Sequence, residues 1–248
     1  MVRLESKISP HRLRLTAYLA ISGVILFIVL TTINMFIYPG SYHIGPLDYY
    51  SDRYMFIYNN LSDLGMLTTF LGEINYKSAV LFTFTLTITG VSFLLYVQHL
   101  PYIFSKDTKS FALAQKGSIL GIISSVTYIG VAWTPWDVAI IPHMIFVFIG
   151  FLVAIPFNIF FALAILRDES YPNGYAYMLI GFIFLIIGYI FALVFGPSAI
   201  STREGRIIES LGQKIIIYSQ MVLIVLSAIG SLRVLNTRHS DHVQTSNQ

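Results

Sequence analysis

Residues 13–37 read LRLTAYLAISGVILFIVLTTINMFI, and this apolar stretch decides the class of protein. A helix needs about 20 apolar residues to cross the roughly 30 Å hydrocarbon core of a bilayer. The N-terminal flank carries Arg3, Lys7, Arg12 and Arg14, as the first region of a signal peptide would. However, the apolar part is too long for a signal peptide and lacks a small-residue cleavage pattern near its end. The stretch is therefore predicted to be a retained first membrane span.

Five further stretches of similar length and hydropathy follow along the chain. The six predicted spans fall at about 13–37, 77–98, 112–133, 139–166, 175–196 and 212–235. The second span contains the alternation FTFTLTIT, but an isolated strand would leave its backbone groups unsatisfied in lipid, so a helix is predicted there. The expected fold class is all-α, a polytopic membrane protein whose six-transmembrane-helix bundle occupies residues 1–238. Residues 239–248 are polar and are expected to form a disordered cytoplasmic tail.

The composition supports a membrane environment. Of the 248 residues, 11% are charged and 56% are hydrophobic, and there is no cysteine. Soluble domains usually contain about 25% charged residues, and a water-soluble fold with so little charge would expose large apolar patches. The lack of cysteine excludes disulfides, thiolate nucleophiles and cysteine metal sites. The net charge is only +3 and no basic run is interleaved with aromatic residues, so no nucleic acid partner is expected.

The placement of Lys and Arg predicts the orientation, because these residues concentrate in cytoplasmic loops. With the N-terminus inside, about two thirds of the 15 Lys and Arg residues, Lys106 among them, fall on the inner side. An even number of spans returns the C-terminus to that side. We therefore expect a multi-pass protein of the cell membrane with both termini in the cytoplasm.

The connection at 38–76 is the longest and is predicted to be extracytoplasmic. Loops beyond about 12–15 residues are usually functional or disordered, and this one is rich in Tyr and Phe. We expect it to fold over the outer surface, with 64–72 as a short interfacial helix. Asn60-Leu61-Ser62 forms an N-glycosylation sequon, which makes Asn60 a candidate for modification.

Polar residues are expected to converge on the outer side of the bundle. The three stretches are YNNLSDLGM at 58–66, WTPWDVAIIPH at 133–143 and REGRIIESLGQK at 203–214. The last one continues into span six as a polar stripe. At 100° per residue, the stripe lies within about 60° of the helix surface and consists of Arg206, Glu209, Gln213, Gln220 and Ser227.

Polar side chains in a membrane helix turn away from lipid and toward the bundle interior. One interpretation of the stripe is an outward-open polar cavity. The alternative is interhelical hydrogen bonding that holds the bundle together, and this is the favoured interpretation for Gln220 and Ser227. Arg206 and Glu209 could equally form an interfacial salt bridge at i, i+3.

The candidate catalytic residues are His143, Asp63 and Asp137. An imidazole at the outer end of span four could transfer protons, with either carboxylate orienting it. A lone histidine can instead be a hydrogen-bonded structural residue, and Asp137 can instead cap the N-terminus of span four. A single histidine with scattered carboxylates lacks metal-ligand spacing, so neither a metal nor a cofactor is expected.

The candidate substrate-binding residues surround this set. Arg206 would hold an anionic group as a charge-assisted donor. Asn59 and Ser62 would supply orienting hydrogen bonds, and Glu209 and Gln213 are further candidates for substrate binding.

The motifs NNLSDLG, WDVAIIPH and GRIIESLGQK together resemble an uncharacterised six-span membrane protein family of prokaryotes, a domain of unknown function. More distantly they are similar to the Frag/DRAM/Sfk-type membrane proteins of eukaryotes, whose outer loop carries Ile-Ser-Asp-x-Gly where this chain has Leu61. The resemblance implies a connection with lipids without defining a reaction. The matching positions are Ser62, Asp63, Gly65, Asp137, His143 and Gln213. The chain lacks the multi-histidine set of ceramidase-like membrane hydrolases, so the resemblance implies no zinc mechanism.

The predicted function is an integral membrane protein whose outward-facing polar pocket binds a lipid or lipid-linked head group, with membrane lipids as its partners. Whether it also modifies that lipid as an enzyme is left open. One alternative is a non-catalytic accessory or scaffold subunit that assembles with other membrane subunits. A third is a small transporter, which would need polar lining that continues to the inner face.

Overall fold

The computed structural model describes residues 9–43, 49–105 and 108–246. Arg3, Lys7 and Lys106, used above to predict the orientation, lie outside these residues. Within them, six helices are long and apolar enough to cross a membrane. They are α1 (Pro10–Ile37), α2 (Tyr76–His99), α3 (Lys109–Trp133), α4 (Ile140–Leu166), α5 (Gly174–Phe195) and α6 (Arg203–Ser246). The prediction of an all-α, multi-pass membrane protein is thus confirmed.

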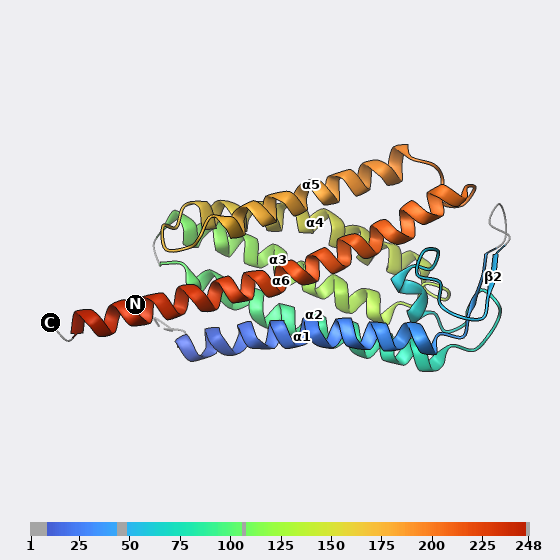
Figure 1. The fold of residues 1–248 in the computed structure, drawn as a ribbon, viewed down its shortest axis with the longest axis horizontal. Coiled ribbons are helices and arrows are strands. Elements are labelled where there is room, and N and C mark those ends of the chain that lie inside the picture. Colours follow the sequence, from blue (N-terminus) through green and yellow to red (C-terminus); the bar gives the residue numbers. More distant parts are fainter. Residues whose placement is uncertain (1–8, 44–48, 106–107, 247–248) are drawn as a thin grey trace.

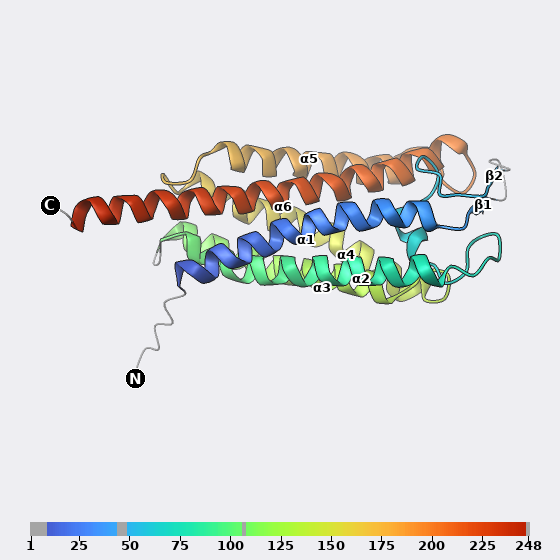
Figure 2. The same cartoon turned by 60° about the horizontal axis from the view of Figure 1, so that its bottom comes forward.

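The six helices form a closed ring. Each packs against the next one in the chain, and α6 returns against α1. Figure 1 and Figure 2 show them running side by side along the long axis of the molecule. Large side chains such as Phe27, Met221 and Ile186 are buried inside the ring, whereas Phe148 of α4 and Phe184 of α5 are exposed on its outer surface. This distribution is expected where lipid surrounds a bundle.

Helix α6 is longer at both ends than the span predicted at 212–235. Its 44 residues correspond to a length of about 66 Å, and it projects beyond the other helices at its C-terminal end (Figure 1). It therefore includes most of 239–248, where the sequence predicts a disordered tail. Adding residues to an existing helix is favourable compared with starting one, and neither Gly nor Pro follows Gly230 to end it.

The long connection between α1 and α2 folds against one end of the bundle. Strand β1 (Ser41–His43) pairs antiparallel with β2 (Tyr49–Ser51), and a 3-10 helix, η1, follows at Leu61–Gly65. The interfacial helix predicted at 64–72 is not formed. Instead a single bridge joins Thr68 to Ile74 across a turn in which Gly72 adopts φ 80, a conformation that glycine adopts without steric cost.

We call residues 54–66 the roof. Its 3-10 helix contacts both α2 and α6, and in Figure 1 it lies among the helix ends at the side where α6 begins. A second 3-10 helix, η2 (Leu100–Ile103), extends α2 at the opposite end.

Candidate functional site

Side chains of α6 hold the roof through its backbone. Four roof residues are bound in this way: the carbonyl of Ile57 by Ser210, that of Tyr58 by Arg206, that of Asn59 by Lys214, and the N–H of Leu61 by Gln213. The Arg206 bond measures 2.8 Å from Nε, and the Gln213 bond measures 2.8 Å to Oε1. A helix leaves N–H groups unpaired at its N-terminus; the Leu61 N–H is one of these and Gln213 satisfies it, whereas the three carbonyls belong to the turn that precedes η1.

Asp63 lies at the centre of the roof and is fully buried. Its Oδ2 accepts hydrogen bonds from Asn59 Nδ2 at 2.8 Å and from the Asn60 N–H at 2.9 Å, and it lies 3.6 Å from Arg206 Nη2. Burial raises the pKa of Asp63, and the nearby Arg206 guanidinium offsets part of this rise. The second carboxylate oxygen, Oδ1, is buried without a hydrogen-bond partner.

The predicted role of Arg206 as an anion-binding residue does not fit this geometry. Its side chain is only 12% exposed, and each of its three nitrogens faces a group of the protein. Nε binds the Tyr58 carbonyl, Nη1 lies 2.9 Å from Glu209, and Nη2 faces Asp63. Arg206, Glu209 and Asp63 therefore stabilise the roof and do not line a cavity, and the same holds for the buried Asn59.

Lys214 belongs to the same cluster, and the sequence reasoning missed it. The residue is 1% exposed, donates to the Ser210 carbonyl at 3.1 Å, and lies 5.6 Å and 5.1 Å from the ring centres of Tyr54 and Phe56. Such cation–aromatic contacts are attractive. The available signal was the i, i+4 row Arg206–Ser210–Lys214, which places three polar residues on one helix edge beside the stripe.

Asp137 binds the chain just beyond the roof. Its carboxylate accepts from the Leu67 N–H at 3.1 Å and from the Thr68 N–H at 2.9 Å. The alternative role as the N-cap of α4 is wrong, because Ala139 occupies that position and no side chain caps the helix. Asp137 thus ties the α3–α4 connection to the long connection before α2.

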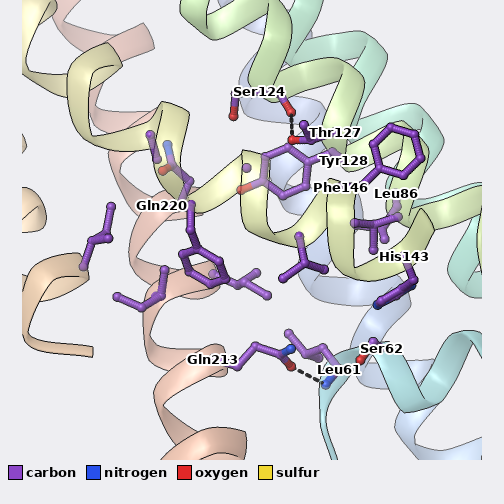
Figure 3. A pocket seen from close by; sticks show the side chains of 18 of the residues that line it. Leu61, Ser62, Leu86, Ser124, Thr127, Tyr128, His143, Phe146, Gln213 and Gln220 are labelled. Atoms are coloured by element: carbon purple, nitrogen blue, oxygen red, sulfur yellow. Dashed lines mark hydrogen bonds between the residues drawn. The ribbon is translucent and has the colours of Figure 1, made fainter. Parts of the chain in front are cut away.

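Below the roof lies a cavity of about 100 Å³ that is lined by residues of all six helices and of η1 (Figure 3). A water needs about 10–15 Å³ measured in this way, so the space would hold roughly seven to ten atoms of that size. Most of the lining is apolar, for example Phe27, Leu86, Phe146, Phe151 and Phe182. The sequence predicted a polar cavity at this place. The polar residues pair with one another in the roof instead, which leaves the space beneath them largely apolar.

Three polar side chains border the cavity at its roof end: Ser62, His143 and Gln213. Figure 3 shows Ser62 beside His143, and Gln213 bonded to Leu61 at the same end. His143 Nδ1 lies 2.6 Å from the Thr134 carbonyl. A carbonyl can only accept, so Nδ1 carries the hydrogen and Nε2 of the neutral ring is an acceptor. The predicted pairing of His143 with Asp63 or Asp137 is not formed.

The polar stripe of α6 faces the interior, as predicted. Gln213 and Gln220 line the central cavity, and Gln220 and Ser227 line a second one of about 20 Å³. Beyond Gln220 the polar groups are engaged with each other: Tyr96 and Ser231 are joined at 2.9 Å, and Tyr171 donates to the Ser227 carbonyl at 3.3 Å. These contacts favour helix packing, the interpretation preferred above for Gln220 and Ser227.

Among the described residues, no group of three or more His, Asp or Glu side chains is placed to hold a metal ion. Comparisons of the chain with models of protein families, with curated proteins and with solved structures gave no match. The chemistry of the site is therefore the basis for assigning a function.

Proposed function

We propose that this protein binds the apolar chain of a membrane lipid or lipid-linked molecule in the cavity enclosed by its six helices, with the polar end of that molecule at the roof. The observation that carries the proposal is the distribution of side chains around the cavity. Most of the lining is apolar, and Ser62, His143 and Gln213 gather at the roof end; the other polar side chains of the lining lie away from the roof and are Ser124, Thr127, Tyr128 and Gln220. Binding sites for small molecules typically combine an apolar lining with a few placed polar groups.

The bilayer supplies ligands that match this distribution, since a lipid joins a long apolar chain to a polar end. The Lys and Arg distribution in the sequence favours an orientation with the roof on the outer face and both termini inside. The proposed ligand would then place its polar end near the outer boundary of the membrane, as lipids of the outer leaflet do.

A transporter is less well supported. Its path would have to continue past Gln220, where the second cavity measures only about 20 Å³, space for one or two waters. Tyr96 of its lining is bonded to Ser231, and Asn158 donates to the carbonyl of Ala154 in its own helix. Nothing comparable among the described residues favours a scaffold subunit.

The proposal can be tested by filling the cavity. Val131 of α3 lines it, whereas Val126 on the same helix is 51% exposed on the outer surface. Full-length wild type, Val131→Phe and Val126→Phe are purified in mild detergent, checked for folding by circular dichroism, and their bound lipids are identified by mass spectrometry. A lipid enriched severalfold in wild type and Val126→Phe but lost from Val131→Phe is expected.

Two results would overturn the proposal: no lipid enriched over the bulk membrane extract in the wild type, or an enriched lipid that Val131→Phe retains in full. Stable co-purification of another membrane protein in place of a lipid would favour the scaffold alternative. Asp63→Ala is a poor probe of the cavity, because Asp63 is buried in the roof and its loss would disturb the fold itself.

A further inference from the structure

The charged side chains near the cavity contact one another and the roof, and none of them lines the cavity. None of the residues that line it is Asp, Glu, Lys or Arg. Asp63 and Lys214 adjoin the lining residues Ser62 and Gln213 in the chain. They belong to the roof cluster, in which two cations, Arg206 and Lys214, accompany two anions, Asp63 and Glu209. Their formal charges cancel, and most of their polar atoms are directed at each other and at the roof backbone; Asp63 Oδ1 and Arg206 Nη2 form no hydrogen bond and are buried within the cluster.

This arrangement disfavours a charged ligand in the cavity. An ion taken out of water into an apolar site needs a partner of opposite charge to offset its lost hydration. The cavity offers none, because the Arg206 guanidinium is enclosed by the Tyr58 carbonyl and two carboxylates. A carboxylate, a phosphate or an ammonium at the roof end would be buried without compensation.

The uncharged groups at the roof end have definite hydrogen-bonding roles. His143 Nε2 is an acceptor, because Nδ1 donates to the Thr134 carbonyl at 2.6 Å. Gln213 directs its oxygen at the Leu61 N–H, 2.8 Å away, so its amide NH₂ group is the part left to donate. Ser62 can do either. The site therefore presents one obligate acceptor and one obligate donor.

On the basis of the proposed function, we infer that the molecule in this cavity is a neutral lipid that ends in a hydroxyl group, recognised by His143 and Gln213. A hydroxyl both donates and accepts, so it donates to His143 Nε2 and accepts from the Gln213 amide. A carbonyl cannot donate, so it could not pair with Nε2 and would leave that acceptor to Ser62 alone. An alkane end bonds to neither His143 nor Gln213.

The test compares saturated chains of one length that end in a hydroxyl, a methyl, a carboxylate or an ammonium group. Each competes with a radiolabelled long-chain alcohol for the full-length protein in detergent micelles. The alcohol should bind about tenfold or more tightly than the other three, since two hydrogen bonds distinguish it. Equal binding of alcohol and alkane, or tighter binding of the carboxylate or ammonium chain, overturns the inference while leaving chain binding intact. Failure of every chain to bind overturns the proposed function as well.

Gln213→Glu separates the two roles of this side chain. The new carboxylate can still accept from the Leu61 N–H, but it has no amide hydrogens to donate. Affinity for the alcohol should fall about tenfold and affinity for the alkane should stay. Gln98→Glu, the same change at an exposed position of α2, should leave both affinities unchanged. Loss of alcohol preference in Gln98→Glu, or its retention in Gln213→Glu, contradicts the inference.

A second measurement does not depend on a variant. In protein with ¹⁵N-labelled histidine, the His143 resonances should report a hydrogen on Nδ1, and the Nε2 signal should shift when the alcohol is added and not when the alkane is added. A ring that is protonated on Nε2 instead, or an Nε2 signal that the alcohol leaves in place, would overturn the inference even if every variant failed to fold.

Discussion

Replacing Asp63 with alanine should loosen the roof and weaken its attachment to α6. Asp63 Oδ2 is the shared acceptor for Asn59 Nδ2 and the Asn60 N–H and the partner of Arg206. Alanine removes all three contacts at once. The Asn60 N–H loses its bond and Arg206 keeps Glu209 as its one carboxylate partner.

The size of the effect follows from the burial of this pair. Asp63 is 0% and the Arg206 side chain 12% exposed, so solvent screens their interaction little. Removing one member of a buried pair typically costs about 3–5 kcal/mol. Asparagine at this position keeps one oxygen for the two amide donors and should cost less, about 1–3 kcal/mol.

Hydrogen exchange measures this loss where it occurs. The amides of Leu61, Asp63 and Met66 are bonded in the roof, and their exchange reports its opening. A cost of 3–5 kcal/mol accelerates exchange by about a hundredfold to a few thousandfold, up to the rate of an unprotected amide. The helical amides of α3 should change far less.

Asp52→Ala is the matched control, because Asp52 lies in the same connection and its ion pair with Arg53 is largely exposed. Such pairs contribute little to stability, so its roof amides should exchange as in the wild type. If the roof amides of Asp63→Ala exchanged no faster than those of Asp52→Ala, Asp63 would not hold the roof.

Three further predictions concern stability and modification. Burial raises the pKa of Asp63 above 3.8, so the folded protein takes up this proton at a higher pH than the unfolded chain does. The free energy of unfolding of wild type relative to Asp63→Asn should rise as the pH falls through the raised pKa and level off below about 3.8, as a pH series of thermal unfolding would show. Gly121→Ala should destabilise the bundle by about 1–3 kcal/mol, because the added carbon would lie 2.8 Å from the Phe157 ring. Gly181→Ala meets nothing within 4 Å and should unfold at the wild-type temperature or slightly above it. Asn60 is half-buried with its Oδ1 enclosed, so a host that glycosylates should add no sugar, and an endoglycosidase should leave the mobility of the protein unchanged.

The six spans were predictable because bilayer thickness sets the length of an apolar run. The ends of α6 were not predictable from hydropathy. Hydropathy indicates where a helix leaves the lipid, whereas the helix itself ends where its backbone hydrogen bonding stops. The inward orientation of Gln213 and Gln220 followed from helix geometry alone. The contact of Asp137 with the Leu67 and Thr68 amides could not be predicted in this way, since it depends on how two distant connections pack together.

The polar residues near the roof were identified from the sequence, yet their predicted role as the lining of an open pocket does not follow from their presence. Buried polar groups first satisfy one another, and the groups left to a ligand are those with remaining hydrogen-bonding capacity. Helix α6 shows both outcomes on neighbouring edges. Arg206, Ser210 and Lys214 donate hydrogen bonds to the roof carbonyls. Gln213 uses its amide oxygen to bind the Leu61 N–H, and its amide NH₂ group is left to donate to a ligand. Ligand binding at this site should therefore depend on Gln213 and His143, which both retain hydrogen-bonding capacity. The charged residues should influence binding only by holding the roof in place.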